Sequence, residues 1–160
     1  MTTFTLFAGG GHTLQGQIAT ACEKLEESQR LDPAAGTRLN LAVCRERQGK
    51  VATAWSLFKL ALAEGRSDQR PDRISFSEQH LAALEPRLPF LTVTLAPGVS
   101  ADGLSVVLDG IPFALASIGV ALPVDPGTHQ VTLTTGDGRT GTISIDARES
   151  AHTRDQKSVV

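Results

Sequence analysis

The sequence has few of the side chains that stack on bases or create a strong electrostatic field. It contains no tyrosine and a single tryptophan, and its 15 basic and 17 acidic residues leave a formal net charge of −2. Binding to nucleic acid or to an anionic membrane generally depends on a basic surface, and single strands also need aromatic platforms. The composition therefore disfavours nucleic acid as a partner.

Long apolar runs are also absent. The longest nearly apolar stretch, IPFALASIGVALPV, ends after 14 residues and contains two prolines and a glycine, whereas a membrane-spanning helix needs about 20 apolar residues. The N-terminal stretch MTTFTLFAGGGHTLQG has neither the basic start nor the long apolar core of a secretory signal. We expect no transmembrane segment, and a chain that is either cytoplasmic or stripped of its leader.

Motifs that would indicate catalysis or a bound cofactor are missing too. The four histidines are scattered along the chain and have no HxH, HxxxH or HExxH spacing. No serine lies in a GxSxG elbow, and AGGGHT lacks the Lys-Ser or Lys-Thr pair of a phosphate loop. The four histidine positions are His12, His80, His129 and His152. We therefore expect no catalytic residue, no metal site and no cofactor, and hence not an enzyme.

The two cysteines, Cys22 and Cys44, lie in no CxxC pair and have no histidine at ligand spacing, so a zinc site is disfavoured. The residues alone leave two alternatives open. Both cysteines could be small core residues on helices, or they could form a disulfide between neighbouring helices, which would need an oxidising compartment.

The N-terminal half contains one octapeptide twice, QGQIATAC at 15–22 and QGKVATAW at 48–55, offset by 48 − 15 = 33 residues. From residue 19 to about 85 apolar residues recur every three or four positions, which is typical of helices. We predict a first helix that ends near Pro33, a second that stops at Gly49, a third over 51–64 and a fourth over 72–85. Asp72 could cap the start of the fourth.

After EPRLP the apolar residues alternate, which is typical of half-buried strands. LTVTLA at 91–96 forms one such run, and LSVVL precedes an Asp109-Gly110 hairpin signal. A Pro-Gly turn and a second Asp-Gly turn separate two further runs, the last with Ile143 and Ile145 expected to point inward. Short strands separated by turns in this way predict a small antiparallel sandwich.

A period of about 33 residues built from helix pairs is similar to a tetratricopeptide array. Gly49 stands where the two helices of such a repeat turn, Ala54 where they touch, and Phe58 at a later packing position. In the first copy Gly16 and Ala21 take the turn and contact positions, followed by Leu25, Ser28 and the closing Pro33. Glycine permits a tight turn and alanine lets helix backbones approach. The first helix of that copy would be TTFTLFAGGGHTL, whose glycines predict a frayed, absent or replaced helix.

The combined pattern resembles a group of exported bacterial envelope proteins in which a short tetratricopeptide-like segment precedes a β domain of the PEGA type. It rests on ACEKLEESQRLDPAAGTRLNLAVC, QGKVATAW, LAALEPRLPFLTV, LDG and LPVDPGTHQV, in that order. The resemblance implies an α+β fold with N-terminal tetratricopeptide-like helical hairpins over 1–88 and a PEGA-like antiparallel β sandwich over 89–147. The last residues, 148–160, have no sustained apolar period, so we expect a disordered tail there.

The resemblance also bears on sites and on function. It implies a Cys22–Cys44 disulfide and a peptide groove lined by Asn40, Val43 and Arg47, which share one helix face. The function it implies is a non-enzymatic protein-interaction module, an adaptor or scaffold at a bacterial cell envelope, in the periplasm or associated with the envelope. The alternative is a cytoplasmic regulatory or accessory segment of a larger signalling protein.

Overall fold

The structure is a computed structural model. It describes the backbone of residues 10–98, 100–149 and 156–159, with side chains over 15–98 and 100–149. Helices come first in the chain and strands follow, so the α+β class predicted from the sequence is confirmed. The chain divides into two compact units, Met1–Ala82 and Ala83–Val160. The sequence places this boundary slightly later, after residue 88.

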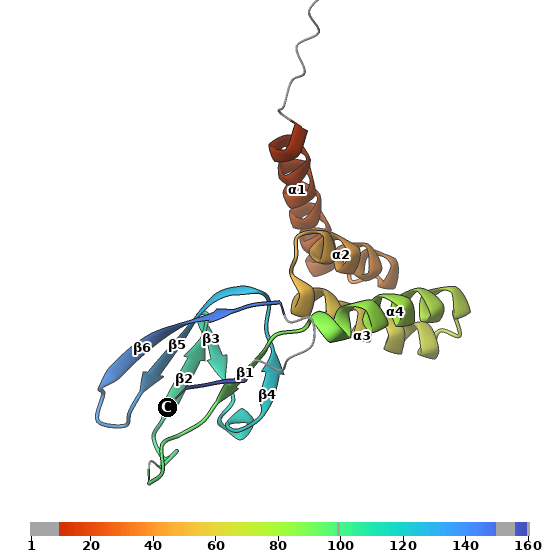
Figure 1. Ribbon diagram of the computed structural model, residues 1–160. Coiled ribbons are helices and arrows are strands. Elements are labelled where there is room, and N and C mark those ends of the chain that lie inside the picture. The colour runs from red at the N-terminus through yellow and green to blue at the C-terminus, as the bar shows by residue number, and fades with distance from the viewer. Residues whose placement is uncertain (1–9, 99, 150–155, 160) are drawn as a thin grey trace, which may run out of the picture. The chain divides into compact units, whose positions relative to one another are not determined.

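In the described part of the N-terminal half, from residue 10 onward, there are four α-helices, as predicted (Figure 1). They are α1 (Gly10–Leu31), α2 (Ala35–Arg47), α3 (Val51–Ser67) and α4 (Pro71–Leu84). Pro33 lies in the break between α1 and α2, and Gly49 turns the chain between α2 and α3 with a φ of 74°. Glycine adopts this left-handed conformation without a steric penalty, which explains why α2 stops there.

The helical core is built mainly on one face of α3. Val51, Ala54, Phe58 and Ala61 follow one another at intervals of three and four residues, and all are buried. Leu41, Ala42 and Cys44 contribute buried side chains from α2. Gly65 allows α3 and α4 to approach closely, because a Cβ at this position would lie 3.2 Å from the Cβ of Arg73.

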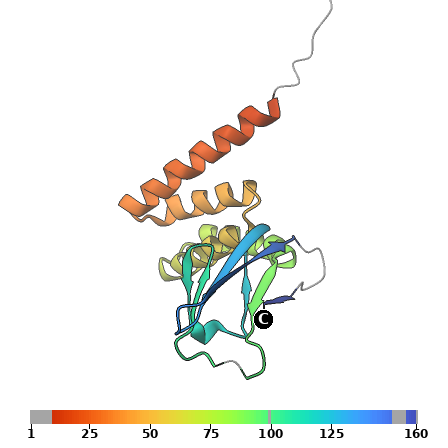
Figure 2. The same cartoon turned by 90° about the vertical axis from the view of Figure 1, so that its left-hand side faces the viewer.

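The prediction that the two octapeptides form equivalent joints is wrong. Gly16 lies inside α1, which continues without a break through Leu31 (Figure 2), and Ala21 is exposed rather than packed between helices. One glycine in a helix interior costs only about 1 kcal/mol, so α1 can run through it. The glycine-rich start is already helical at Gly10, and residues 1–9 of the expected first helix lie outside the described residues.

The predicted cap of the fourth helix is also displaced. Asp72 stands in the first turn of α4, because the helix already begins at Pro71. Proline suits this first helical position, since its fixed φ is helical and its missing N–H would have no partner there. The Asp72 carboxylate instead accepts hydrogen bonds from Arg70 at 2.8 and 3.1 Å.

The described residues of the second unit form seven short strands and two 3₁₀ turns, η1 (Glu85–Arg87) and η2 (Leu115–Ser117). The strands are β1 (Phe90–Val93), β2 (Ser105–Leu108), β3 (Ile111–Phe113), β4 (Ala121–Pro123), β5 (Gly127–Thr134), β6 (Thr140–Ala147) and β7 (Gln156–Val159). One sheet has the order β4-β1-β7 and the other the order β3-β2-β5-β6. Leu91 and Val93 of the first sheet form one buried cluster with Val106 and Val131 of the second. The arrangement is therefore that of a small sandwich.

The predicted Asp109-Gly110 hairpin is confirmed between β2 and β3. Leu108 pairs with Ile111, and the two turn residues have φ angles of 51° and 81°, both positive as a type I′ turn requires. As predicted, Ile143 lies on the inner face of its sheet together with Ile145 and opposite the buried Val131, but 39% of Ile143 is exposed, whereas Ile145 packs against the core. The reason is that β6 lies at the edge of its sheet.

The tail predicted as disordered over 148–160 differs in part. Within it Gln156–Val159 form β7, which pairs in parallel with the whole of β1. The backbone hydrogen bonds of this pairing order the four residues without needing an apolar pattern in the sequence. The three-stranded sheet is thus mixed, because β4 runs antiparallel to β1 on its other side.

Candidate functional site

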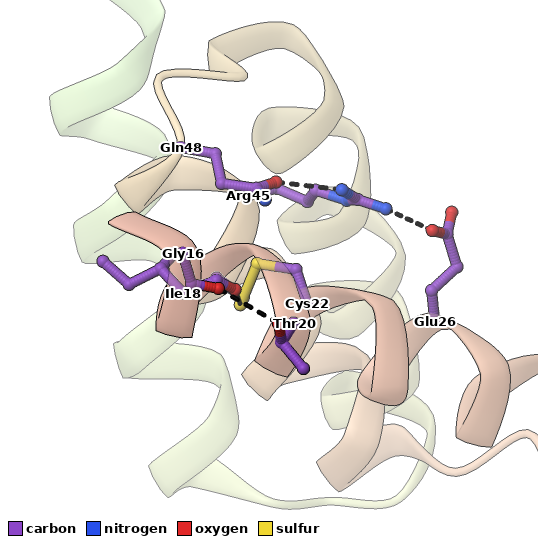
Figure 3. Close-up of a disulfide and its surroundings, with 8 residues drawn as sticks. Gly16, Ile18, Thr20, Cys22, Glu26, Arg45 and Gln48 are labelled. Carbon is purple, nitrogen blue, oxygen red and sulfur yellow. Dashed lines mark hydrogen bonds and ion pairs between the residues drawn. A yellow bond between two sulfur atoms is a disulfide. The ribbon is translucent and has the colours of Figure 1, made fainter. Parts of the chain in front are cut away.

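A disulfide joins α1 to α2 through Cys22 and Cys44 (Figure 3). The S–S distance is 2.06 Å and the two Cα atoms are 5.5 Å apart. Cys22 is completely buried, and the Sγ of Cys44 lies 3.6 Å from the carbonyl oxygen of Ile18. The bond therefore holds the middle of α1 against the C-terminal half of α2.

A nearly buried arginine reinforces the same contact. Arg45 is only 8% exposed, and its guanidinium pairs with the Glu26 carboxylate of α1 and donates to the Gln48 side-chain oxygen at 2.9 Å (Figure 3). A guanidinium can be buried in this way because each partner satisfies its donors. Nothing in the local sequence pattern around Arg45 indicates its partner, because Glu26 lies on another helix.

An open groove of about 310 Å³ lies between α1 and the end of α2. We call it the α1–α2 groove. Its lining residues come from α1 (Gln15, Ile18 and Ala19) and from the end of α2 and the turn after it (Arg47, Gln48 and Lys50).

The charge of the α1–α2 groove is positive. Among the described residues Arg47 and Lys50 take part in no ion pair, and no carboxylate lines the groove. The other arginines of the described helical segments each have an acidic partner, for example Arg38 with Glu64 and Arg66 with Glu78. The groove thus combines an aliphatic wall with two free cations, which suits a ligand carrying both apolar and acidic groups.

The structure brings only one of the three residues predicted for the peptide groove into this groove. Arg47 lines it, whereas Asn40 and Val43 lie outside the lining, Asn40 exposed and Val43 partly exposed. The groove forms between two helices rather than along α2 alone. The sequence predicts a turn at Gly16, and this prediction does not place Gln15, Ile18 and Ala19 on one continuous helix beside α2.

The described histidines have structural partners. In the β unit His129 Nδ1 lies 2.6 Å from the Asp109 carboxylate, and Nε2 lies 2.6 Å from the Asp125 carbonyl oxygen. Burial by itself would lower the pKa of His129, but the hydrogen bonds to Asp109 and Asp125 outweigh it and raise the pKa above the usual value. Since both ring nitrogens are engaged, neither is free to act as a general base.

Asp109 is the partner that holds the hairpin turn. Its second carboxylate oxygen accepts the backbone N–H of Gln130 at 2.8 Å. Burial would raise the pKa of Asp109, but the hydrogen bonds from His129 and Gln130 lower it overall. The pair therefore links the turn before β3 to the start of β5 through charge-assisted hydrogen bonds.

The described part of the chain contains no cluster of side chains that could bind a metal ion. Over 15–98 and 100–149 no group of three or more histidine, cysteine, aspartate or glutamate residues is placed to hold an ion. The predicted positions His12 and His152 lie outside the residues whose side chains are described. None of the helices in the described segments is long and apolar enough to cross a membrane.

Comparison with known proteins identifies no relative that would assign a role to this groove. The chain matches no protein-family model, and no curated protein matches it significantly.

Proposed function

We propose that this chain is a non-enzymatic protein-interaction module, an adaptor or scaffold at a bacterial cell envelope, and that the α1–α2 groove is where its helical unit takes a peptide segment. The observation that carries the proposal is a pair of cations, Arg47 and Lys50, which form no ion pair among the described residues and lie beside an aliphatic wall in an open groove. A groove of this kind can bind an extended segment through side-chain contacts and through charge.

The disulfide supports the envelope as the location. Disulfides form and persist in oxidising compartments, which in bacteria means the periplasm and the cell surface, and they are rare among cytosolic proteins. Cys22 and Cys44 join the two helices that line the groove. The oxidised disulfide therefore helps to hold the binding surface in shape.

Site-specific photocrosslinking tests the binding surface. A benzoylphenylalanine at Gln48, inside the groove, should give a defined adduct in living cells, and the same residue at the exposed Ser75 of α4 should not. The double variant Arg47→Gln, Lys50→Gln should lose the adduct, because the cations attract the partner. Equal adducts at both positions, or an adduct indifferent to the two charges, would refute the groove as the binding surface.

Thiol trapping tests the location. Rapid alkylation of whole cells, followed by denaturation without reductant, should leave Cys22 and Cys44 unmodified, and the protein should fractionate with the envelope. Two alkylated thiols together with cytosolic fractionation would contradict the envelope assignment and favour a cytoplasmic regulatory segment.

A further inference from the structure

The strand β6 leaves one long edge of its sheet open. All eight of its residues pair with β5, from Thr140 opposite Thr134 to Ala147 opposite Gly127. In the described segments no other strand pairs with β6, so its outer backbone groups face away from the sheet. Proteins usually protect such an edge, because unpaired N–H and C=O groups recruit another strand.

Two of the other edge strands, β3 and β4, carry such protection, whereas most of β6 does not. Strand β3 is three residues long and contains Pro112, and β4 is three residues long and ends at Pro123. In β6 the six residues from Thr140 to Ile145 include neither a charge nor a proline. Its Ile143 is 39% exposed although it lies on the same face as the buried Val131 opposite it.

We propose that β6 pairs antiparallel with β6 of a second copy of this chain, around a two-fold axis at Ser144. A two-fold axis perpendicular to the sheet keeps each side chain on its own face, and residues equally far from Ser144 then stand opposite each other. Ile143 thus faces Ile145 of the second copy.

The apolar face supports this register. The exposed Ile143 gains an aliphatic neighbour, and the row that starts at Val131 continues through Ile143 to Ile145 of the second copy. The axis generates the same row twice, so both exposed isoleucines become covered.

The polar face and the strand ends are complementary in the same register. Thr142, whose hydroxyl lies 3.0 Å from that of Thr132 on β5, comes opposite the acceptor Asp146. Arg139 comes opposite Glu149, which is 41% exposed beside Arg87 of its own chain. No like charges face each other, whereas a register centred on Ile143 would oppose Asp137 and Glu149.

Self-association of the full chain tests the proposal. Interfaces of one strand pair are small and bind weakly, so sedimentation equilibrium is run up to about 1 mM protein. We expect a monomer–dimer equilibrium whose Kd rises at least about tenfold in Ile143→Lys, since each copy then places a charged lysine opposite Ile145 of the other copy. The matched control Ile111→Lys changes an exposed isoleucine on the opposite edge strand, β3, and should leave the Kd unchanged.

Crosslinking tests the register and does not depend on the lysine variant folding. A short bifunctional thiol reagent should join two copies of Ser144→Cys, because the residue faces itself across the axis, and it should join Thr140→Cys poorly. The native cysteines do not react, since both are in the disulfide. Arg139→Glu should weaken the dimer, and adding Glu149→Arg should restore it.

Three results would overturn the proposal. The first is a monomer throughout the concentration range, which would mean that the β6 edge contacts a different protein or solvent. The second is a dimer that is equally sensitive to Ile111→Lys and Ile143→Lys. The third is equal crosslinking at 140 and 144. Because β6 is independent of the α1–α2 groove, each of these outcomes leaves the photocrosslinking test of that groove unaffected.

Discussion

The imidazole of His80 lies flat on the ring of Phe58, with the ring centroids 4.5 Å apart and the planes 13° from parallel. The same imidazole places Nδ1 2.6 Å from the Glu46 carboxylate, so one α4 side chain connects the core of α3 to the surface of α2. Phe76 also contacts this pair, with its ring centroid 4.5 Å from that of His80 and 6.3 Å from that of Phe58. The three consecutive helices α2, α3 and α4 thus meet around His80.

Replacing Phe58 by alanine should destabilise the helical unit by about 3–5 kcal/mol, because the side chain is fully buried and its removal leaves a cavity. Phe76→Ala should cost only about 1–2 kcal/mol, since this ring is 41% exposed. Urea unfolding followed by the fluorescence of Trp55, the single tryptophan and a residue of α3, measures both. Equal losses would contradict the placement of Phe58 at the centre of the core.

Removing the disulfide should lower the free energy of unfolding of the helical unit by about 3 kcal/mol, because Cys22 and Cys44 close a loop with a sequence separation of 22. The variant Cys22→Ser, Cys44→Ser is compared with the wild type by Trp55 fluorescence in urea. Adding reductant to the wild type should reproduce the loss, and adding it to the variant should have no effect. An unchanged midpoint in the double variant would show that the bond does not constrain the unfolded chain.

The stability of the β unit should depend on pH through His129 and Asp109. The raised pKa of His129 means that its stabilising contribution is complete below the usual value of 6.5 and is lost as the pH rises through the folded-state value. The lowered pKa of Asp109 means that its contribution is present above the usual 3.8 and is lost as the pH falls through the folded-state value. Stability from this pair is therefore greatest between about pH 4 and 6.5.

Urea unfolding monitored by NMR at the Val131 methyl groups measures this dependence, because Val131 is buried in the β unit. The wild type should lose stability as the pH rises above about 6.5, and His129→Gln should flatten that limb. Asp109→Asn should bring the pKa of His129 down in a direct NMR titration, since the carboxylate is its charged partner. A His129 pKa at or below 6.5 in the wild type would contradict the hydrogen-bonded geometry.

The sequence predicts the elements well where local chemistry decides them. The four helices follow from the spacing of residues such as Val51, Ala54 and Phe58, and the first hairpin follows from Asp109-Gly110, whose positive φ angles few other dipeptides accept. The prediction of the disulfide rests on a family resemblance, because the residues alone are compatible both with a bonded pair and with two free cysteines.

The remainder depends on contacts between distant parts of the chain, which no local pattern contains. The burial of Arg45 depends on Glu26 of another helix, and β7 is ordered by a parallel pairing with β1. The α1–α2 groove similarly requires Ile18 to lie beside the end of α2. Gly16 is the clearest case, because its neighbours are almost the same letters as those of Gly49, yet only Gly49 turns the chain.

The two glycines of the repeated octapeptide should therefore respond oppositely to alanine. Gly16 lies in a helix interior with nothing within 4 Å of a Cβ, so Gly16→Ala should stabilise the helical unit by about 0.5–1 kcal/mol. Gly49 has a φ of 74°, so Gly49→Ala should destabilise it by about 1–2 kcal/mol even though the space around it is open. Trp55 fluorescence in urea reports both, and because the neighbouring residues match, each variant controls for the other. Destabilisation by both would mean that Gly16 also turns the chain, as an array of equivalent repeats requires, and that α1 is not one continuous helix.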